Sequence, residues 1–156
     1  MADGKSPEER LAELGLGVPE VVPPVAVYVP AVRVGSLVYT AGQLPMLDGA
    51  LMATGKVGGE VTAEQATACA QQCALNAIAA IRSVAGDLTH VRIVKVVAFV
   101  ASTPDFTGQP GVANGASELF GSVFGDAGVH ARSAVGVPVL PLDAPVEVEV
   151  TAEIVG

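Results

Sequence analysis

The chain has 156 residues, of which 51% are hydrophobic and 15% are charged, a composition that excludes an intrinsically disordered protein and predicts one globular domain. Sixteen acidic and eight basic residues give a formal net charge of −8, and this sign disfavours nucleic acid and anionic membranes as partners. This low charged fraction leaves little polar surface for a small monomer. Because buried subunit interfaces would account for it, we expect an oligomer.

The N-terminal segment predicts a short helix followed by an extended linker. Ser6-Pro7-Glu8-Glu9 is a capping box with proline at the first helical position, and Gly15 ends the helix after Leu14. The apolar run 21–32 contains three prolines and is too short to span a membrane. No signal-peptide core precedes it. We therefore expect a cytoplasmic protein.

Two strands are predicted next, Val25–Val34 and Leu37–Thr40, separated by the Gly35-Ser36 turn. The glycine-rich stretch 42–59 predicts a loop. A second capping box, Thr62 with Gln65, then begins the most regular helix of the sequence.

This helix is expected to run to about Val84 and to end at Gly86. Cys69 and Cys73 lie four residues apart on its apolar face, where we expect small buried side chains rather than a disulfide or a zinc site. The side chains expected on its wetter side are those of Gln71, Gln72, Asn76 and Arg82.

The C-terminal half predicts further elements in alternation. They are a strand over Val91–Ala101, a weaker helix over Val112–Phe124, and strands over Ala131–Val139 and Val146–Val155. Long helices on one face of a mixed sheet make this an α+β two-layer domain. Along the last strand glutamates alternate with valines, so the glutamate face is either solvated or a polar interface with another subunit.

Arg132 is the only basic residue from Val96 to Gly156 and, in a strand, shares its face with Ala134 and Gly136. A lone guanidinium above so small a floor suits a carboxylate ligand held by a bidentate fork. A salt bridge to Glu147 on a neighbouring strand is the structural alternative. The residues alone leave both interpretations open.

Three further residues have a similar ambiguity. Glu147 either lies on a solvated strand face or handles a water molecule. Asn114, on a glycine-rich turn, caps its helix or binds a ligand, and Tyr28 packs or lines a cleft. The sequence lacks nucleotide-binding glycine motifs, a serine nucleophile elbow and a metal-ligand cluster. An enzyme with this sequence would therefore rely on water or on the substrate itself for bond formation.

At this point the motifs resemble a known family. Residues 35–45, GSLVYTAGQLP, resemble the G-x-x-v-x-t-S-G-Q-x-P segment of the RidA/YjgF reactive-intermediate deaminases. Residues 131–135, followed by Leu140-Pro141 and by 146–149, are similar to the C-terminal signature of that family. The resemblance covers residues 26–155. It implies an N-terminal extension over 1–24 and a single domain over 25–156.

The resemblance implies a chorismate-mutase-like α+β fold and a homotrimer with active sites in clefts between subunits. It also implies hydrolysis of 2-imino or 2-enamino acids to 2-keto acids and ammonia, without a metal or an organic cofactor. In that chemistry Arg132 holds the substrate carboxylate and Glu147 handles the attacking water. Tyr28 and Asn114 correspond to substrate-binding positions of the family.

Two further substrate-binding positions depart from the family pattern. Ala41 stands where the family has serine, and Ala134 stands where it has cysteine, although the backbone carbonyl there could still bind water. These departures motivate an alternative, a non-catalytic carboxylate-binding or regulatory trimer that uses the same Arg132 pocket. An endoribonuclease, a label often attached to such sequences, is disfavoured by the net charge and the lack of a basic groove.

Overall fold

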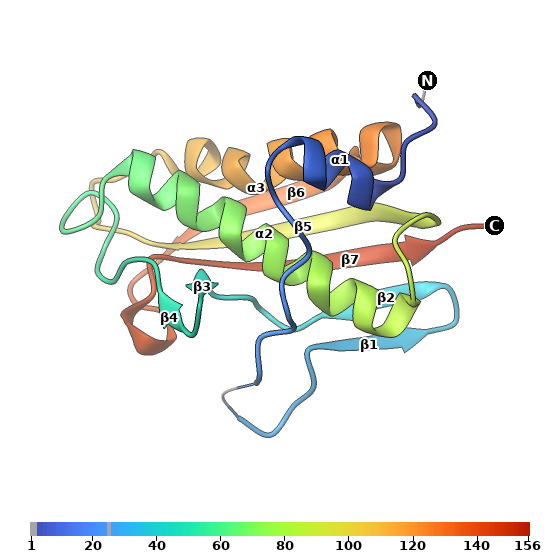
Figure 1. Cartoon of the computed structure of the whole chain (residues 1–156). Helices are drawn as coiled ribbons and strands as arrows, with labels where there is room; N and C mark the ends of the chain where they lie inside the picture. The colour runs from blue at the N-terminus through green and yellow to red at the C-terminus, as the bar shows by residue number, and fades with distance from the viewer. Residues whose placement is uncertain (1–2, 25) are drawn as a thin grey trace.

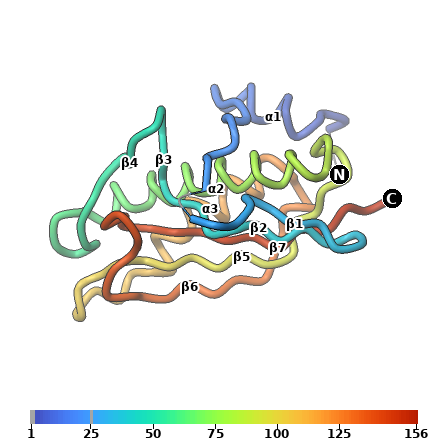
Figure 2. Tube along the Cα trace, turned by 90° about the horizontal axis from the view of Figure 1, so that it is seen from below, coloured from blue at the N-terminus to red at the C-terminus, as the bar shows by residue number. Residues whose placement is uncertain are grey.

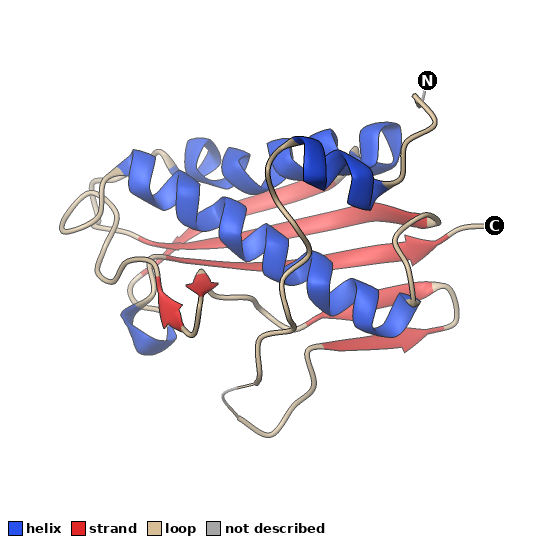
Figure 3. Cartoon of the chain, viewed as in Figure 1, coloured by secondary structure: helices blue, strands red, loops and turns tan. Residues whose placement is uncertain are grey.

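The computed structural model describes residues 3–24 and 26–156. The helices in these ranges are α1 (Pro7–Glu13), α2 (Ala63–Ala85) and α3 (Gln109–Phe124). The strands are β1 (Ala31–Val34), β2 (Leu37–Thr40), β3 (Met46–Leu47), β4 (Ala50–Leu51), β5 (Val91–Ala101), β6 (Ala131–Val137) and β7 (Val146–Ile154). Short 3₁₀ turns lie at Gly125–Gly128 and Pro141–Asp143. Figures 1 and 3 show these elements along the chain.

The main sheet has five strands in the order β1-β2-β7-β5-β6. Strands β5 and β6 are parallel, whereas the other neighbours are antiparallel. A parallel pair needs a long crossover connection, and α3 lies in the segment that supplies it. The α+β class with a mixed sheet is confirmed, and the strand predicted over Val91–Ala101 forms with those bounds.

The helices cover one face of this sheet, as Figure 2 shows from the side. The core lies between the two layers, where Val146, Val148 and Val150 of β7 are buried on the face that α2 covers. Helix α2 begins at the predicted capping box and ends at Gly86, whose φ of 90° suits a glycine. Both cysteines are free and buried, as expected. None of the helices in the described ranges is long and apolar enough to cross a bilayer.

The opposite face of the sheet carries exposed apolar side chains. Val32, Val34 and Tyr39 on strands β1 and β2, and Val135 on β6, are each more than one third exposed. Strand pairing places them on the face of the β7 glutamates, because Tyr39 pairs with Thr151 and Val135 with Phe99. Figure 2 shows no helix on this side of the described chain. An apolar sheet face of this kind is typical of a surface that a partner covers.

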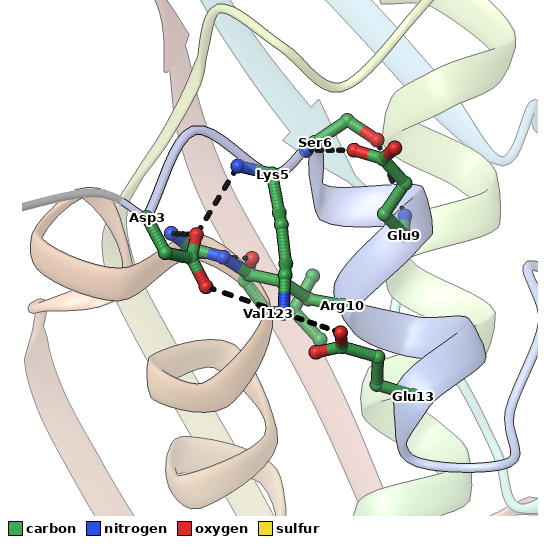
Figure 4. Close-up of polar contacts among 7 residues, drawn as sticks. All are labelled: Asp3, Lys5, Ser6, Glu9, Arg10, Glu13 and Val123. Carbon is green, nitrogen blue, oxygen red and sulfur yellow. Dashed lines mark hydrogen bonds and ion pairs between the residues drawn. The ribbon is translucent and has the colours of Figure 1, made fainter.

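Helix α1 is fixed to the C-terminal end of α3. The predicted capping box forms between Ser6 and Glu9. Leu11 of this helix is fully buried in the core. The Nη1 of Arg10 donates to the carbonyl oxygen of Val123 at 3.4 Å. Figure 4 shows this contact and the ion pairs around it. The N-terminal helix is thus packed on the domain, while the domain boundary placed at residue 24 stays a prediction.

Several sequence predictions about local structure are wrong. The strand expected over Val25–Val34 begins only at Ala31: residues 26–30 form a loop, and Val25 lies outside the described residues. Pro30, which cannot donate to a strand ladder, marks this boundary. The strand expected to reach residue 139 ends at Val137 for the same reason, because Pro138 follows.

The third error concerns the loop expected over residues 42–59. It contains the β3–β4 hairpin, in which Leu47 pairs with Ala50 across a two-residue turn. Asp48 and Gly49 in this turn have φ values of 53° and 83°. An Asp-Gly pair with two positive φ angles is a strong hairpin signal that the glycine-rich composition obscured.

Asn76 was expected on the wetter side of its helix and is instead buried, with 1% of its surface exposed. Its Nδ2 donates to the backbone oxygens of Leu44 and Met46, at 3.0 Å each, and its Oδ1 accepts from Gln72 at 3.2 Å. The amide therefore ties helix α2 to the segment between β2 and the hairpin. Burial is tolerated because both ends of the amide are hydrogen-bonded.

Candidate functional site

Arg132 on edge strand β6 lies against helix α3. Its Nη1 donates to Asn114 Oδ1 at 2.8 Å and to Ser117 Oγ at 3.1 Å, and its Nη2 donates to the carbonyl oxygen of Pro110 at 3.3 Å. These bonds occupy three of the five N–H donors of a guanidinium. The donors left without a partner in the described chain are Nε–H and one Nη2–H, which are available to a carboxylate.

The partners of Arg132 lie on one face of α3. Pro110, Asn114 and Ser117 are spaced by four and three residues, the spacing that brings helical side chains to one side. The sequence analysis identified Asn114 and missed Ser117. The same i, i+3 spacing could have found it, since any side chain that faces the Arg132 strand shares the face of Asn114.

The residues that share a strand face with Arg132 have small side chains. Pairing places Arg132, Ala134 and Gly136 opposite Val96, Ala98 and Val100, which point into the core, so all three share the helix-covered face. A Cβ at Gly136 would lie 2.9 Å from Ser102 Oγ and 2.8 Å from Gln109 Nε2. The small-residue floor expected beside Arg132 is therefore present, and a larger residue at 136 would displace these side chains.

Glu147 lies on the other face of the sheet, half-buried at the start of β7. Burial raises the pKa of its carboxyl, and the nearby charge of Glu149 raises it further. Within the described chain its carboxylate makes no hydrogen bond or ion pair. A Cβ at Gly42 would lie only 2.4 Å from its Oε1, so the absence of a side chain at Gly42 makes room for the carboxylate.

A pocket of about 780 Å³ opens beside this carboxylate. Tyr28, Ala41 and Gln43 lie at its wall together with Glu147. Its other lining residues are mostly apolar: Val22, Pro23, Pro24, Ala26, Pro30, Leu44, Met46 and Pro141, with Gly42 and Gly49. Tyr28 projects from a loop rather than from the predicted strand, with 44% of its surface exposed.

The backbone of the Ala41-Gly42-Gln43 turn is tightly held. Gln43 pairs with Val148 through both backbone groups, at 2.8 and 3.0 Å, and its side-chain amide donates to the carbonyl oxygen of Ala41 at 3.2 Å. The amide N–H of Ala41 donates to Pro30 at 2.8 Å. This turn therefore fixes the pocket wall next to Glu147, but Ala41 supplies no hydroxyl to it.

The predicted site residues fall into two groups that one chain does not bring together. Arg132, Asn114 and Ala134 lie at the edge strand under α3, whereas Glu147, with Tyr28 and Ala41 nearby, lies at the pocket on the opposite face. From strand spacing and register, the Cα atoms of Arg132 and Glu147 are about 14 Å apart, with side chains on opposite faces. The proposed salt bridge between them is therefore wrong, since β6 pairs with β5 rather than with β7.

Each half of the site, the Arg132 group and the Glu147 group, can contribute a different chemical function. The Arg132 half offers two oriented cationic N–H donors, which suit a planar carboxylate. The Glu147 half offers a carboxylate that burial makes more basic than an ordinary glutamate, next to an apolar pocket. The described residues contain no group of three or more His, Cys, Asp and Glu side chains that could hold a metal ion.

Comparison with known proteins identifies a family for the chain. The profile of the family described as "YjgF/chorismate mutase-like, putative endoribonuclease" matches residues 8–154. Protein TCP17 of Trypanosoma cruzi is 43% identical over 147 residues, covering 93% of this chain and 92% of that protein. A 2-iminobutanoate/2-iminopropanoate deaminase of Dermatophagoides farinae is 35% identical over 127 residues, covering 81% and 84%. The crystal structure of Atu1372 from Agrobacterium tumefaciens, a protein of unknown function, is 43% identical with a TM-score of 0.87, covering 95% of this chain and 91% of that one.

Proposed function

Because the chain belongs to the YjgF/RidA/chorismate mutase-like family, we propose that it hydrolyses 2-imino and 2-enamino acids to 2-keto acids and ammonia. The observation that carries this proposal is Arg132, which lies beside small residues and keeps Nε–H and one Nη2–H without a partner in the described chain. A guanidinium held by neutral partners keeps its full charge for an anionic ligand. The similarity to a 2-iminobutanoate deaminase supports the same substrate class.

Arg132 acts in this proposal as the carboxylate anchor. The 2-imino acid binds through its carboxylate to the open guanidinium edge, while Asn114 Oδ1 holds the other side of the same guanidinium at 2.8 Å. Fixing the carboxylate also fixes the adjacent imine carbon, because the two carbons are directly bonded. Positioning of this kind is the main contribution that a site without a cofactor can make.

Glu147 acts on the water. Its carboxylate accepts a proton as the water oxygen bonds to the carbon of the protonated imine, which gives a carbinolamine with a neutral amine. That proton then passes to the amine nitrogen, the C–N bond breaks, and ammonia leaves. The hydroxyl proton returns to the carboxylate as the carbonyl forms. Burial supports this role, because a carboxylate with a raised pKa is a stronger base than an exposed glutamate.

The two halves meet only between copies of the chain. We place Arg132 of one copy opposite the Glu147 pocket of the next, in the homotrimer that the family resemblance implies. The exposed apolar face carrying Val32, Val34, Tyr39 and Val135 supports such an assembly, since it is the face on which Glu147 lies. Burial of this face between copies would also account for the low charged fraction of the sequence.

One observation favours a second candidate, a trimer that binds small carboxylates without turnover. Ala41 provides no hydroxyl at the pocket wall next to Glu147, so fewer polar groups remain to orient the water. Restoring the hydroxyl with Ala41→Ser separates the two candidates. A binding protein gains turnover only in this variant, whereas a deaminase is already active without it.

The direct test of the proposal is ammonia release from freshly generated 2-iminobutanoate, compared between the wild type and Arg132→Ala. We expect acceleration by the wild type and a loss of about 100-fold in kcat/KM in the variant, as the loss of charge-assisted hydrogen bonds predicts. Arg33→Ala is the matched control, because Arg33 is exposed on β1 and, among the described residues, donates only to the carbonyl oxygen of Gly35. Equal rates with and without the wild-type protein would contradict the deaminase.

A further inference from the structure

The contacts of Arg132 continue beyond its direct partners. Ser117 Oγ, which accepts from Arg132 Nη1, lies 2.9 Å from Nε2 of His130. The other ring nitrogen of this histidine, Nδ1, lies 2.6 Å from the carbonyl oxygen of Gly128. Arg132 is therefore the first member of a four-group chain that ends on the backbone next to β6.

The hydrogen-bond directions along this chain follow from what each group can do. A carbonyl oxygen only accepts, so His130 Nδ1 carries the hydrogen and donates to Gly128. In the neutral imidazole Nε2 is then an acceptor, and the single hydroxyl hydrogen of Ser117 is directed to it. The lone pairs of Ser117 Oγ are thereby left for Arg132. Each donor in the chain has one acceptor, and no direction conflicts with the next.

The histidine is itself held in place. Its ring meets Phe120 edge to face, with centroids 5.9 Å apart and an interplanar angle of 84°. Phe120 is fully buried in the core on α3. The chain thus connects the guanidinium to the packed interior through groups that have little freedom to reorient.

We propose that Ser117 and His130 are positioning residues that orient the Arg132 guanidinium, so that its Nε–H and Nη2–H edge faces the ligand carboxylate. This inference rests on the proposed function, in which Arg132 is the carboxylate anchor. Without Ser117 one Nη1–H loses its acceptor, and the orientation of the guanidinium is fixed by its bonds to Asn114 and Pro110 alone. A bidentate contact depends on the orientation of the guanidinium plane as well as on its charge.

The test uses Ser117→Ala and His130→Phe in the full chain. The phenylalanine keeps a ring against Phe120 but removes both nitrogens. Since the carboxylate contact is already made in the bound substrate, we expect KM for 2-iminobutanoate to rise about 3- to 10-fold, with a smaller fall in kcat from looser placement of the imine carbon. Ser117→Thr retains the hydroxyl and should restore the wild-type KM. Ser122→Ala, an exposed serine elsewhere on α3, is the matched control.

A double variant distinguishes positioning from general stability. If Ser117 acts through Arg132, adding Ser117→Ala to Arg132→Ala causes no further loss of kcat/KM. A further loss in that background, or a wild-type KM in both single variants, would overturn the inference. Melting temperatures of all variants show whether any of them is poorly folded.

Calorimetric binding of 2-oxobutanoate, a carboxylate probe that cannot be deaminated, separates the failure of this inference from the failure of the proposed function. Binding by the wild type that weakens in Ser117→Ala and His130→Phe, without turnover of imines, would reject the deaminase and support the positioning role. Turnover by the wild type with unchanged KM and unchanged probe affinity in both variants would support the deaminase and reject the positioning role.

Discussion

Gly42→Ala is expected to lower activity while leaving stability nearly unchanged. The added Cβ would lie 2.4 Å from Oε1, 2.7 Å from Cδ and 3.0 Å from Cγ of Glu147. A relaxed carbon–oxygen contact is near 3.4 Å, so the carboxylate has to move by about 1 Å, a displacement that can reduce catalysis about 100-fold. The clash falls on the far end of a flexible side chain, so the backbone need not shift.

The stability of this variant should change little. Gly42 does not have a positive φ, so alanine fits its backbone conformation, and the lower entropy of the unfolded chain would offset part of the strain by about 0.4–1 kcal/mol. The assay is kcat/KM for 2-iminobutanoate beside the melting temperature of the same preparation. Gly17→Ala is the control, because an added Cβ there would meet none of the described residues within 4 Å.

Two results would refute this reasoning. A Gly42→Ala variant that keeps full activity would show that the position of the Glu147 carboxylate is unimportant. A variant that loses activity only because it unfolds would show that the glycine serves the fold rather than the site. The predicted result is a folded protein with about 100-fold lower kcat/KM.

Three further predictions concern the pocket and the packing behind it. The pKa of Glu147 is raised by burial and by Glu149, so kcat/KM of the wild type should rise with pH through a value above the ordinary 4.5. The same shift makes the wild type lose stability over that range as pH increases, and Glu147→Gln should remove this loss from urea-unfolding profiles. Asn76→Leu leaves two backbone carbonyls without their donor and should lower the free energy of unfolding by about 2–4 kcal/mol, measured in urea. An unchanged urea midpoint would contradict the claim that the Asn76 hydrogen bonds hold α2 to the pocket wall. Gly115→Ala places a Cβ 2.1 Å from the carbonyl oxygen of Thr67 and should lower the free energy of unfolding by about 3 kcal/mol. Gly121→Ala in the same helix is the control: its Cβ meets none of the described residues within 4 Å, so the variant should be neutral or stabilising.

Elements set by local chemistry were predictable from the sequence. The capping boxes at Ser6 and Thr62 mark two helix starts, because a side-chain acceptor satisfies backbone donors that lie within three residues. The β7 alternation also gave the correct faces, with valines inward and Glu147 outward. In each case the interacting groups are close in sequence, so the pattern contains the information.

Features set by tertiary packing were not predictable in the same way. The partners of the Asn76 amide lie about 30 residues away in a loop, so its helical periodicity could not reveal that it is buried. The relation of Arg132 to Glu147 depends on strand order, and no local pattern indicates that β6 pairs with β5. Tyr28 was placed on a strand because the apolar residues around it outweighed the nearby Pro30 signal.

The candidate site was found as residues but not as an arrangement. The family resemblance pointed to Arg132 and Glu147, and the structure shows that one chain holds them on opposite faces of its sheet. Ser117 and His130 were not selected, because a hydroxyl and an imidazole have no sequence signature until the guanidinium they support is located.

The account depends most on the claim that Arg132 and Glu147 of different copies form one site. The most direct measurement mixes two inactive variants, Arg132→Ala and Glu147→Gln, after partial unfolding and joint refolding, and assays ammonia release from 2-iminobutanoate. With random exchange of subunits in a closed ring, about one quarter of the sites combine an intact arginine from one copy with an intact glutamate from the next. The account predicts recovery to about that fraction of wild-type activity. Mixed oligomers that form, as shown by mass, but stay inactive would contradict it.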